Sequence, residues 1–113
     1  MDRDRWHVIE EEDGALVLAR CLPARFDLAA ETVLAGDVGR RRLAHLVRQD
    51  MWRMLRHLRG FQPVVRVARV PGGLHLRAGG AVAGRFARKV AEAQIAGLLA
   101  DPGHRARWTG FGR

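Results

Sequence analysis

The chain contains no serine, no tyrosine and only one cysteine among its 113 residues. The lack of serine excludes a serine nucleophile, and the single Cys21 allows neither an internal disulfide nor a cysteine-based zinc site. Cys21 stands beside Arg20 and before Leu22-Pro23, with no histidine close to it in the sequence. We therefore expect a buried, unreactive thiol. These absences favour a binding protein over an enzyme, and no catalytic residue is predicted.

Long apolar runs are also absent. No stretch approaches the roughly 20 apolar residues that a helix needs to cross a membrane. The first residues, MDRDRWHVIEEED, are charged and lack the apolar core of a secretory signal. We therefore expect a cytoplasmic protein with no membrane partner. A chain of 113 residues has room for one hydrophobic core, which predicts a single domain over residues 1–108 and a flexible tail over 109–113.

Motifs for metals and cofactors are missing as well. The five histidines show no HxxxH or HxH spacing, and the two on one predicted element, His45 and His57, are twelve residues apart. The glycine-rich stretch 77–85 (RAGGAVAGR) fits neither GxGxxG nor GxxxxGK[ST]. We interpret it as a flexible connector, with anion binding by its backbone amides as the weaker alternative. No metal, cofactor or small-molecule substrate is predicted.

Arginine is the residue that the sequence has in excess. Of the 20 basic residues 19 are arginine, against 12 acidic residues, for a net charge of +8. Residues 1–39 have a net charge of −5 and residues 40–113 a net charge of +13. This asymmetry is typical of a basic surface for phosphate or for an acidic partner. It also fits the arginine-rich composition of a high-GC genome, or an acidic segment that lies across the chain's own basic face.

The spacing of apolar residues and turns predicts the order β-β-α-β-β-α. Strands are predicted over residues 6–9 and 15–20, joined at Asp13-Gly14, and over 64–70 and 74–78, joined at Pro71-Gly72-Gly73. Residues 24–36 fit either a short helix or an irregular crossing. Helices are predicted over 38–59 and 85–100, and Asp101-Pro102 is expected to start a short turn that ends at Trp108. We expect a small α+β domain in which two hairpins form one antiparallel sheet with both helices on one face.

The predicted helix over 38–59 has the strongest signal. Its apolar residues recur at steps of three and four, and they are Leu43, Leu46, Val47, Met51, Met54, Leu55 and Leu58. Asp37 is predicted as the N-cap and Gly60 as the C-terminal cap. The run Arg40-Arg41-Arg42 opposes the helix dipole at this end. It is either solvated, bound to a polyanion, or covered by the acidic segment at 10–13.

A second stripe on the same helix predicts the binding site. Residues spaced three and four apart form this stripe beside the apolar face. They are Arg41, His45, Arg48, Trp52, Arg56 and Arg59. Tryptophan and arginine are over-represented at interface hot spots, so the stripe predicts docking onto a partner protein or a second copy of the chain. Arginine also binds phosphate and an indole stacks on unpaired bases. Nucleic acid bound through the basic C-terminal two-thirds is therefore the alternative, although no standard recognition motif occurs.

A competing interpretation of the stripe packs Trp52 under the N-terminal hairpin, covered by an arginine stem. The end of the chain repeats the same combination of arginine and aromatic residues at Arg105, Arg107, Trp108, Phe111 and Arg113. These residues are predicted to dock into a partner, to cover an edge of the sheet, or to pack Trp108 back onto the last helix.

Overall fold

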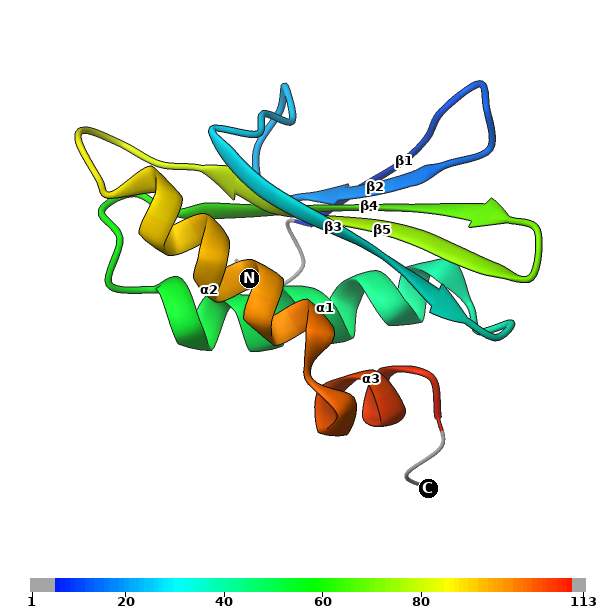
Figure 1. Cartoon of the computed structure of the whole chain (residues 1–113). Helices are drawn as coiled ribbons and strands as arrows, with labels where there is room; N and C mark the ends of the chain where they lie inside the picture. Colours follow the sequence, from blue (N-terminus) through cyan, green and yellow to red (C-terminus); the bar gives the residue numbers. More distant parts are fainter. Residues whose placement is uncertain (1–5, 111–113) are drawn as a thin grey trace.

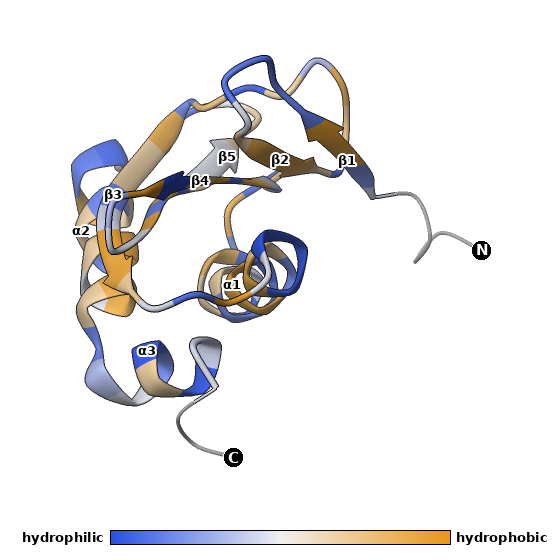
Figure 2. Ribbon diagram, turned by 90° about the vertical axis from the view of Figure 1, so that its right-hand side faces the viewer, coloured by the Kyte–Doolittle hydropathy of each residue, from blue (hydrophilic) through white to orange (hydrophobic). Residues whose placement is uncertain are grey.

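A computed structural model describes residues 6–110, which form one sheet and three helices (Figure 1). The elements are β1 (His7–Glu10), β2 (Leu16–Ala19), β3 (Leu28–Ala35), α1 (Arg40–Leu55), β4 (Gln62–Val70), β5 (Gly73–Ala81), α2 (Arg88–Ala100) and α3 (Pro102–Trp108). All strand pairs are antiparallel, and the order across the sheet is β1-β2-β4-β5-β3. The helices lie on one side of this sheet (Figure 2). The predicted α+β fold and the order β-β-α-β-β-α are confirmed, with β3 as an additional strand.

Strand β3 was foreseen by neither interpretation of residues 24–36. The segment contains four alanines and two leucines, which favour helices. Its side chains nevertheless alternate between the two faces of the sheet, since Leu28 and Leu34 are buried whereas Val33 is 53% exposed. The segment pairs with β5 over eight residue pairs. This pairing and the burial of one face override the local helix preference.

Helix α1 begins two residues later than predicted. Its N-cap is Gly39, without a capping side chain, so the prediction of Asp37 as the N-cap is wrong. Asp37 stands two residues too early to reach the first amides of the helix, and its carboxylate pairs with Arg69 of β4 at 2.7 Å. The predicted apolar face is confirmed: Leu43, Val47, Met51 and Leu55 are fully buried, and Leu46, Met54 and Leu58 pack partly buried against the same core.

The helix also ends earlier than predicted, at Leu55 with Arg56 as its C-cap. Gly60 is therefore not the helix cap; it follows four residues after Arg56, and with φ +66° it turns the chain into β4. At 16 residues α1 is the longest helix, and nowhere in residues 6–110 is a helix long and apolar enough to cross a membrane.

The glycine-rich stretch is ordered where a flexible connector was predicted. Gly79 and Gly80 lie inside β5, opposite Ala29 and Leu28 of β3. A Cβ atom on Gly79 would overlap the carbonyl oxygen of Leu28 and lie 2.8 Å from the Cα atom of Ala29. The two backbones approach too closely for a side chain, so these glycines are needed for strand packing.

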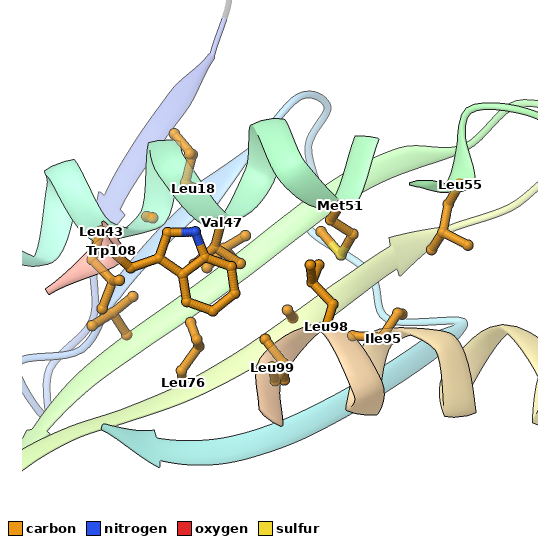
Figure 3. Close-up of a cluster of buried hydrophobic side chains, with 14 of the residues drawn as sticks. Leu18, Leu43, Val47, Met51, Leu55, Leu76, Ile95, Leu98, Leu99 and Trp108 are labelled. Atoms are coloured by element: carbon orange, nitrogen blue, oxygen red, sulfur yellow. The ribbon is translucent and has the colours of Figure 1, made fainter. Parts of the chain in front are cut away.

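The predicted short turn after Asp101 is helix α3, which anchors the C-terminal region in the core. Asp101 caps it by accepting a hydrogen bond from the amide of His104 at 2.9 Å. Trp108, its last residue, is fully buried beside Leu43, Val47, Leu76 and Leu99 (Figure 3).

Trp108 is held in place by a buried carboxylate. Its indole Nε1 donates a hydrogen bond of 2.7 Å to Asp50 on α1, and Asp50 also pairs with Arg107. Asp50 is the one buried charged residue of the described chain, and both of its partners come from α3. The alternative in which Trp108 docks into a partner is therefore wrong, whereas Phe111 and Arg113 lie outside the described residues.

The two edges of the sheet differ. At the β3 edge, Glu92 of α2 accepts a hydrogen bond from the amide of Ala29 at 3.0 Å, and Arg105 of α3 donates one to the carbonyl of Val33 at 2.8 Å. Arg105 thus covers an edge, as one of the predictions for the end of the chain proposed. The opposite edge is β1, whose four residues pair with β2 alone.

Candidate partner-binding site

The acidic N-terminal segment folds onto two arginines that lie outside the predicted stripe. Glu10 pairs with Arg40 at 3.4 Å, and Glu11 and Asp13 both pair with Arg66 of β4 at 2.9 and 2.6 Å. One residue of the arginine run at the start of α1 is therefore covered by this segment, as one of the three alternatives proposed. The stripe itself is not covered.

The stripe residues have no carboxylate partner within the described part of the chain. Arg41 is exposed, His45 and Arg48 are half-buried, and Trp52 is 41% exposed. Because α1 ends at Leu55, Arg56 is its cap and Arg59 lies in the following turn. The prediction that all six residues share one helical stripe is therefore wrong for Arg59.

Trp52 stays at the surface. Its indole stacks on Phe61, with ring centroids 6.2 Å apart and planes 7° from parallel, and it is not covered by the hairpin. The interpretation that buries Trp52 under an arginine stem is wrong. The tryptophan under an arginine is Trp6, immediately before β1: the guanidinium of Arg48 lies 4.5 Å and that of Arg20 5.6 Å from its ring centroid.

These groups surround a hollow of about 420 Å³, which we call the Trp-Arg hollow. It lies where the start of β1, the end of β2, the middle of α1 and the start of β4 meet. Its walls are Trp6, Arg20, Arg48, Trp52, Phe61, Gln62 and Pro63. Of the six predicted site residues, only Arg48 and Trp52 line it.

Sequence reasoning missed Trp6, Arg20 and Phe61, and the predicted hairpin turn did not give the register that brings the first two together. In the β1–β2 ladder His7 lies opposite Ala19, so the same register continued by one residue places Trp6 opposite Arg20. A tight two-residue turn at Asp13-Gly14 would instead place Trp6 opposite Cys21. The observed loop is one residue longer, since the amide of Glu11 donates a hydrogen bond to the carbonyl of Ala15, and this shift brings Arg20 opposite Trp6. The contact of both residues with α1 depends on how the sheet packs against the helix, which no local pattern shows.

The hollow has a positive potential that its own arginines produce. Burial lowers the pKa of Arg48, and the neighbouring charge of Arg20 lowers it further. Burial likewise lowers the pKa of His45 below 6.5, with smaller contributions from the charges of Arg48 and Arg41. His45 is therefore neutral at pH 7, and its Nδ1 lies 3.4 Å from Nη2 of Arg48.

A pH titration tests this arrangement. We expect the His45 ring to titrate with a midpoint below 6.5 in the folded protein when it is followed by NMR. The lowered pKa means that the unfolded chain binds this proton more strongly than the folded protein does. The contribution of neutral His45 to folding stability is therefore complete above about pH 6.5, the pKa of the unfolded chain. This contribution is lost as the pH falls through the lower pKa of the folded protein. Arg48→Gln should raise the midpoint only part of the way, since burial is the larger cause, and Arg53→Gln should leave it unchanged. A midpoint at or above 6.5 contradicts this account.

The thiol of Cys21 lies outside the Trp-Arg hollow, since Cys21 is not one of its walls. Cys21 is exposed, so the prediction of a buried thiol is wrong; it follows the end of β2, in the connection to β3, where the alternation of the strand no longer applies. No group of three histidine, cysteine or acidic side chains within residues 6–110 could hold a metal ion. The chemistry that the Trp-Arg hollow offers is stacking, apolar contact and the donation of hydrogen bonds by arginine.

Comparison of the chain with family models, with curated proteins and with solved structures finds no match.

Proposed function

We propose that this is a small non-enzymatic adaptor that docks the Trp-Arg hollow and the adjoining arginines of α1 onto an acidic segment of a partner protein. The observation that supports this most is the exposed Trp52 beside Arg20 and Arg48, two arginines without a carboxylate partner in the described chain. Tryptophan and arginine that converge in a concave site are typical of interface hot spots. A cytoplasmic location is part of the same proposal.

A different protein fits the hollow better than a second copy of the chain does. Among residues 6–110 every carboxylate except that of Glu12 already accepts a hydrogen bond or pairs with a cation inside the molecule. A second copy therefore offers few free acidic side chains to two unpaired arginines. We propose a partner that presents an acidic surface, because opposite charges favour the encounter and select the partner.

Nucleic acid is the second candidate, favoured by the exposed Trp52 and by the arginines that follow it. Arg53, Arg56 and Arg59 form no ion pair with a carboxylate of residues 6–110. Nucleic acid would not use the whole basic part of the chain, since Arg66, Arg69, Arg105 and Arg107 are bound to groups of the protein itself. The walled shape of the hollow fits a protein side chain, and this favours the first candidate.

The partner can be identified and the docking surface tested in two steps. A photo-crosslinking residue at Gln49, exposed on α1 beside the hollow, should capture a protein that the same residue at Gln94 on α2 does not. With that protein purified, Trp52→Ala should weaken binding by a factor of roughly 30 or more, as expected for a hot-spot tryptophan. Val90→Ala is the matched control, because Val90 is a 62% exposed apolar side chain on α2, and it should leave the dissociation constant unchanged.

Equal binding by the Trp52→Ala and Val90→Ala variants would overturn the proposed docking surface. The second candidate has its own measurement, the fluorescence anisotropy of labelled single-stranded RNA and DNA at low salt. Binding that weakens steeply with added salt, together with no crosslinked protein at Gln49, would replace the adaptor function by nucleic-acid binding.

A further inference from the structure

Trp6 attracts both arginines but does not satisfy their N–H donors. An aromatic face attracts a nearby cation, and the indole N–H is itself only a hydrogen-bond donor. Arg48 and Arg20 both lie over the Trp6 ring, at 4.5 and 5.6 Å from its centroid, and both line the Trp-Arg hollow. The indole attracts the two cations without satisfying these donors.

Residues 6–110 supply few hydrogen-bond acceptors to the N–H groups of Arg20 and Arg48. Nε of Arg48 is buried without a hydrogen-bond partner, and its Nη2 has only the 3.4 Å contact with His45. Arg20 has no ion pair with any carboxylate of residues 6–110. Two like charges held together in a partly buried site are unfavourable, and an anion between them would relieve the repulsion.

The rest of the hollow limits what that anion can be attached to. Trp52 forms an aromatic stack with the buried Phe61 on one side, and Gln62 and the buried Pro63 also line the hollow. An aromatic ring fits against such a wall, whereas a fully hydrated ion would leave it uncovered.

We infer that the Trp-Arg hollow is a carboxylate-binding site, in which Arg20 and Arg48 bind the carboxylate while Trp52, Phe61 and Pro63 contact an adjoining aromatic or apolar group. The inference rests on the proposed function, because it names the chemistry that the partner presents. An acidic side chain beside an aromatic residue and the C-terminal carboxylate of an aromatic residue share this chemistry. A carboxylate accepts two parallel hydrogen bonds from the fork of an arginine.

Small probes test the site without the partner. The ¹⁵N-labelled full chain is titrated with 3-phenylpropionate, with its neutral amide 3-phenylpropionamide, and with phenyl phosphate. The signals of the three indole N–H groups are followed by NMR and assigned with Trp6→Phe and Trp52→Phe. We expect 3-phenylpropionate to shift the Trp6 and Trp52 signals in a saturable way, with a dissociation constant on the order of 1 mM for so small a ligand. The buried Trp108 signal should not move, and the amide should bind at least tenfold more weakly.

Two variants distinguish binding in the hollow from non-specific attraction to a positively charged surface. Arg48→Gln should weaken the binding of 3-phenylpropionate at least fivefold. Arg53→Gln removes an exposed arginine of the same helix that does not line the hollow and should not change it. Arg20→Gln repeats the test from the end of β2, so that a folding defect in one variant does not decide the outcome.

Three results would overturn the inference: equal binding of the acid and the amide, equal loss in the Arg48→Gln and Arg53→Gln variants, or binding of phenyl phosphate in clear preference to the carboxylate. The last result would point to a phosphate ligand and to the nucleic-acid candidate. The docking surface itself is decided separately, by the comparison of Trp52→Ala with Val90→Ala on the crosslinked protein. Failure of the carboxylate site and failure of the adaptor function are thus distinguishable.

Discussion

Replacing Trp108 with alanine is expected to lower the free energy of unfolding by about 3–5 kcal/mol, the usual cost of removing a large buried aromatic side chain. Trp108 is fully buried among side chains of α1, α2 and the sheet (Figure 3). Its removal would leave a cavity and would also take one of two partners from the buried carboxylate of Asp50. A domain of this size has a total stability of only about 5–15 kcal/mol, so the loss should be visible in urea unfolding and in thermal melting.

Two further variants divide this loss between packing and hydrogen bonding. Trp108→Phe retains an aromatic ring but loses the indole N–H, so it should cost less than Trp108→Ala. Asp50→Ala leaves the buried indole N–H without an acceptor and should cost about 1–3 kcal/mol, while Asp50→Asn keeps an acceptor oxygen and should cost less. A loss below about 1 kcal/mol for Trp108→Ala, well under the packing cost, would show that α3 is not docked as described.

Replacing Gly79 with alanine is expected to lower the free energy of unfolding by about 3 kcal/mol or more, at the upper end of the range for inserting a methyl group into a packed site. The added Cβ would overlap the Leu28 carbonyl oxygen, which is backbone and cannot rotate away as a side chain does. Strand β3 would have to move from β5 along their shared ladder. Unfolding in urea measures the loss, and aggregated protein in size-exclusion chromatography would show detachment of β3.

Gly97 offers the same substitution with the opposite expected sign. It lies within α2, and a Cβ added there meets nothing within 4 Å. Gly97→Ala should raise the free energy of unfolding by about 0.5–1 kcal/mol, since alanine favours the helix over glycine by this amount. Equal effects of the two substitutions would contradict the close approach of β3 and β5.

The elements that sequence analysis predicted are those whose apolar spacing and turn residues agree with the final packing. The helix face from Leu43 to Leu55 and the hairpin between the first two strands both depend on local signals, and both are confirmed. The loop of that hairpin is one residue longer than the tight turn predicted at Asp13-Gly14. Strand β3 could not be predicted in this way, because its residues favour a helix and its partner β5 follows only after α1 and β4 in the chain. The start of α1 was misplaced because Asp37 lies two residues before the observed N-cap, Gly39, and its carboxylate pairs with Arg69 of β4 instead.

Sequence analysis predicted only those residues of the candidate site that share one helix. Arg48 and Trp52 lie on one helix, so their spacing placed them together. Trp6, Arg20 and Phe61 reach the hollow from three other segments, and only the packing of the sheet on α1 assembles them. The sequence likewise did not show what the acidic segment binds, because its partner Arg66 lies on β4, far along the chain.

The hydrogen bonds from Glu92 and Arg105 to the β3 edge limit how copies of this protein can assemble. A sheet that grows by strand addition needs unpaired backbone groups at its edges, and on β3 the amide of Ala29 and the carbonyl of Val33 are already bound by side chains from α2 and α3. A strand added at the β3 edge would have to displace both of these hydrogen bonds, whereas one added at β1 would not. Association through the sheet edges of this fold is therefore favoured at β1, in a pairing of two copies related by a two-fold axis.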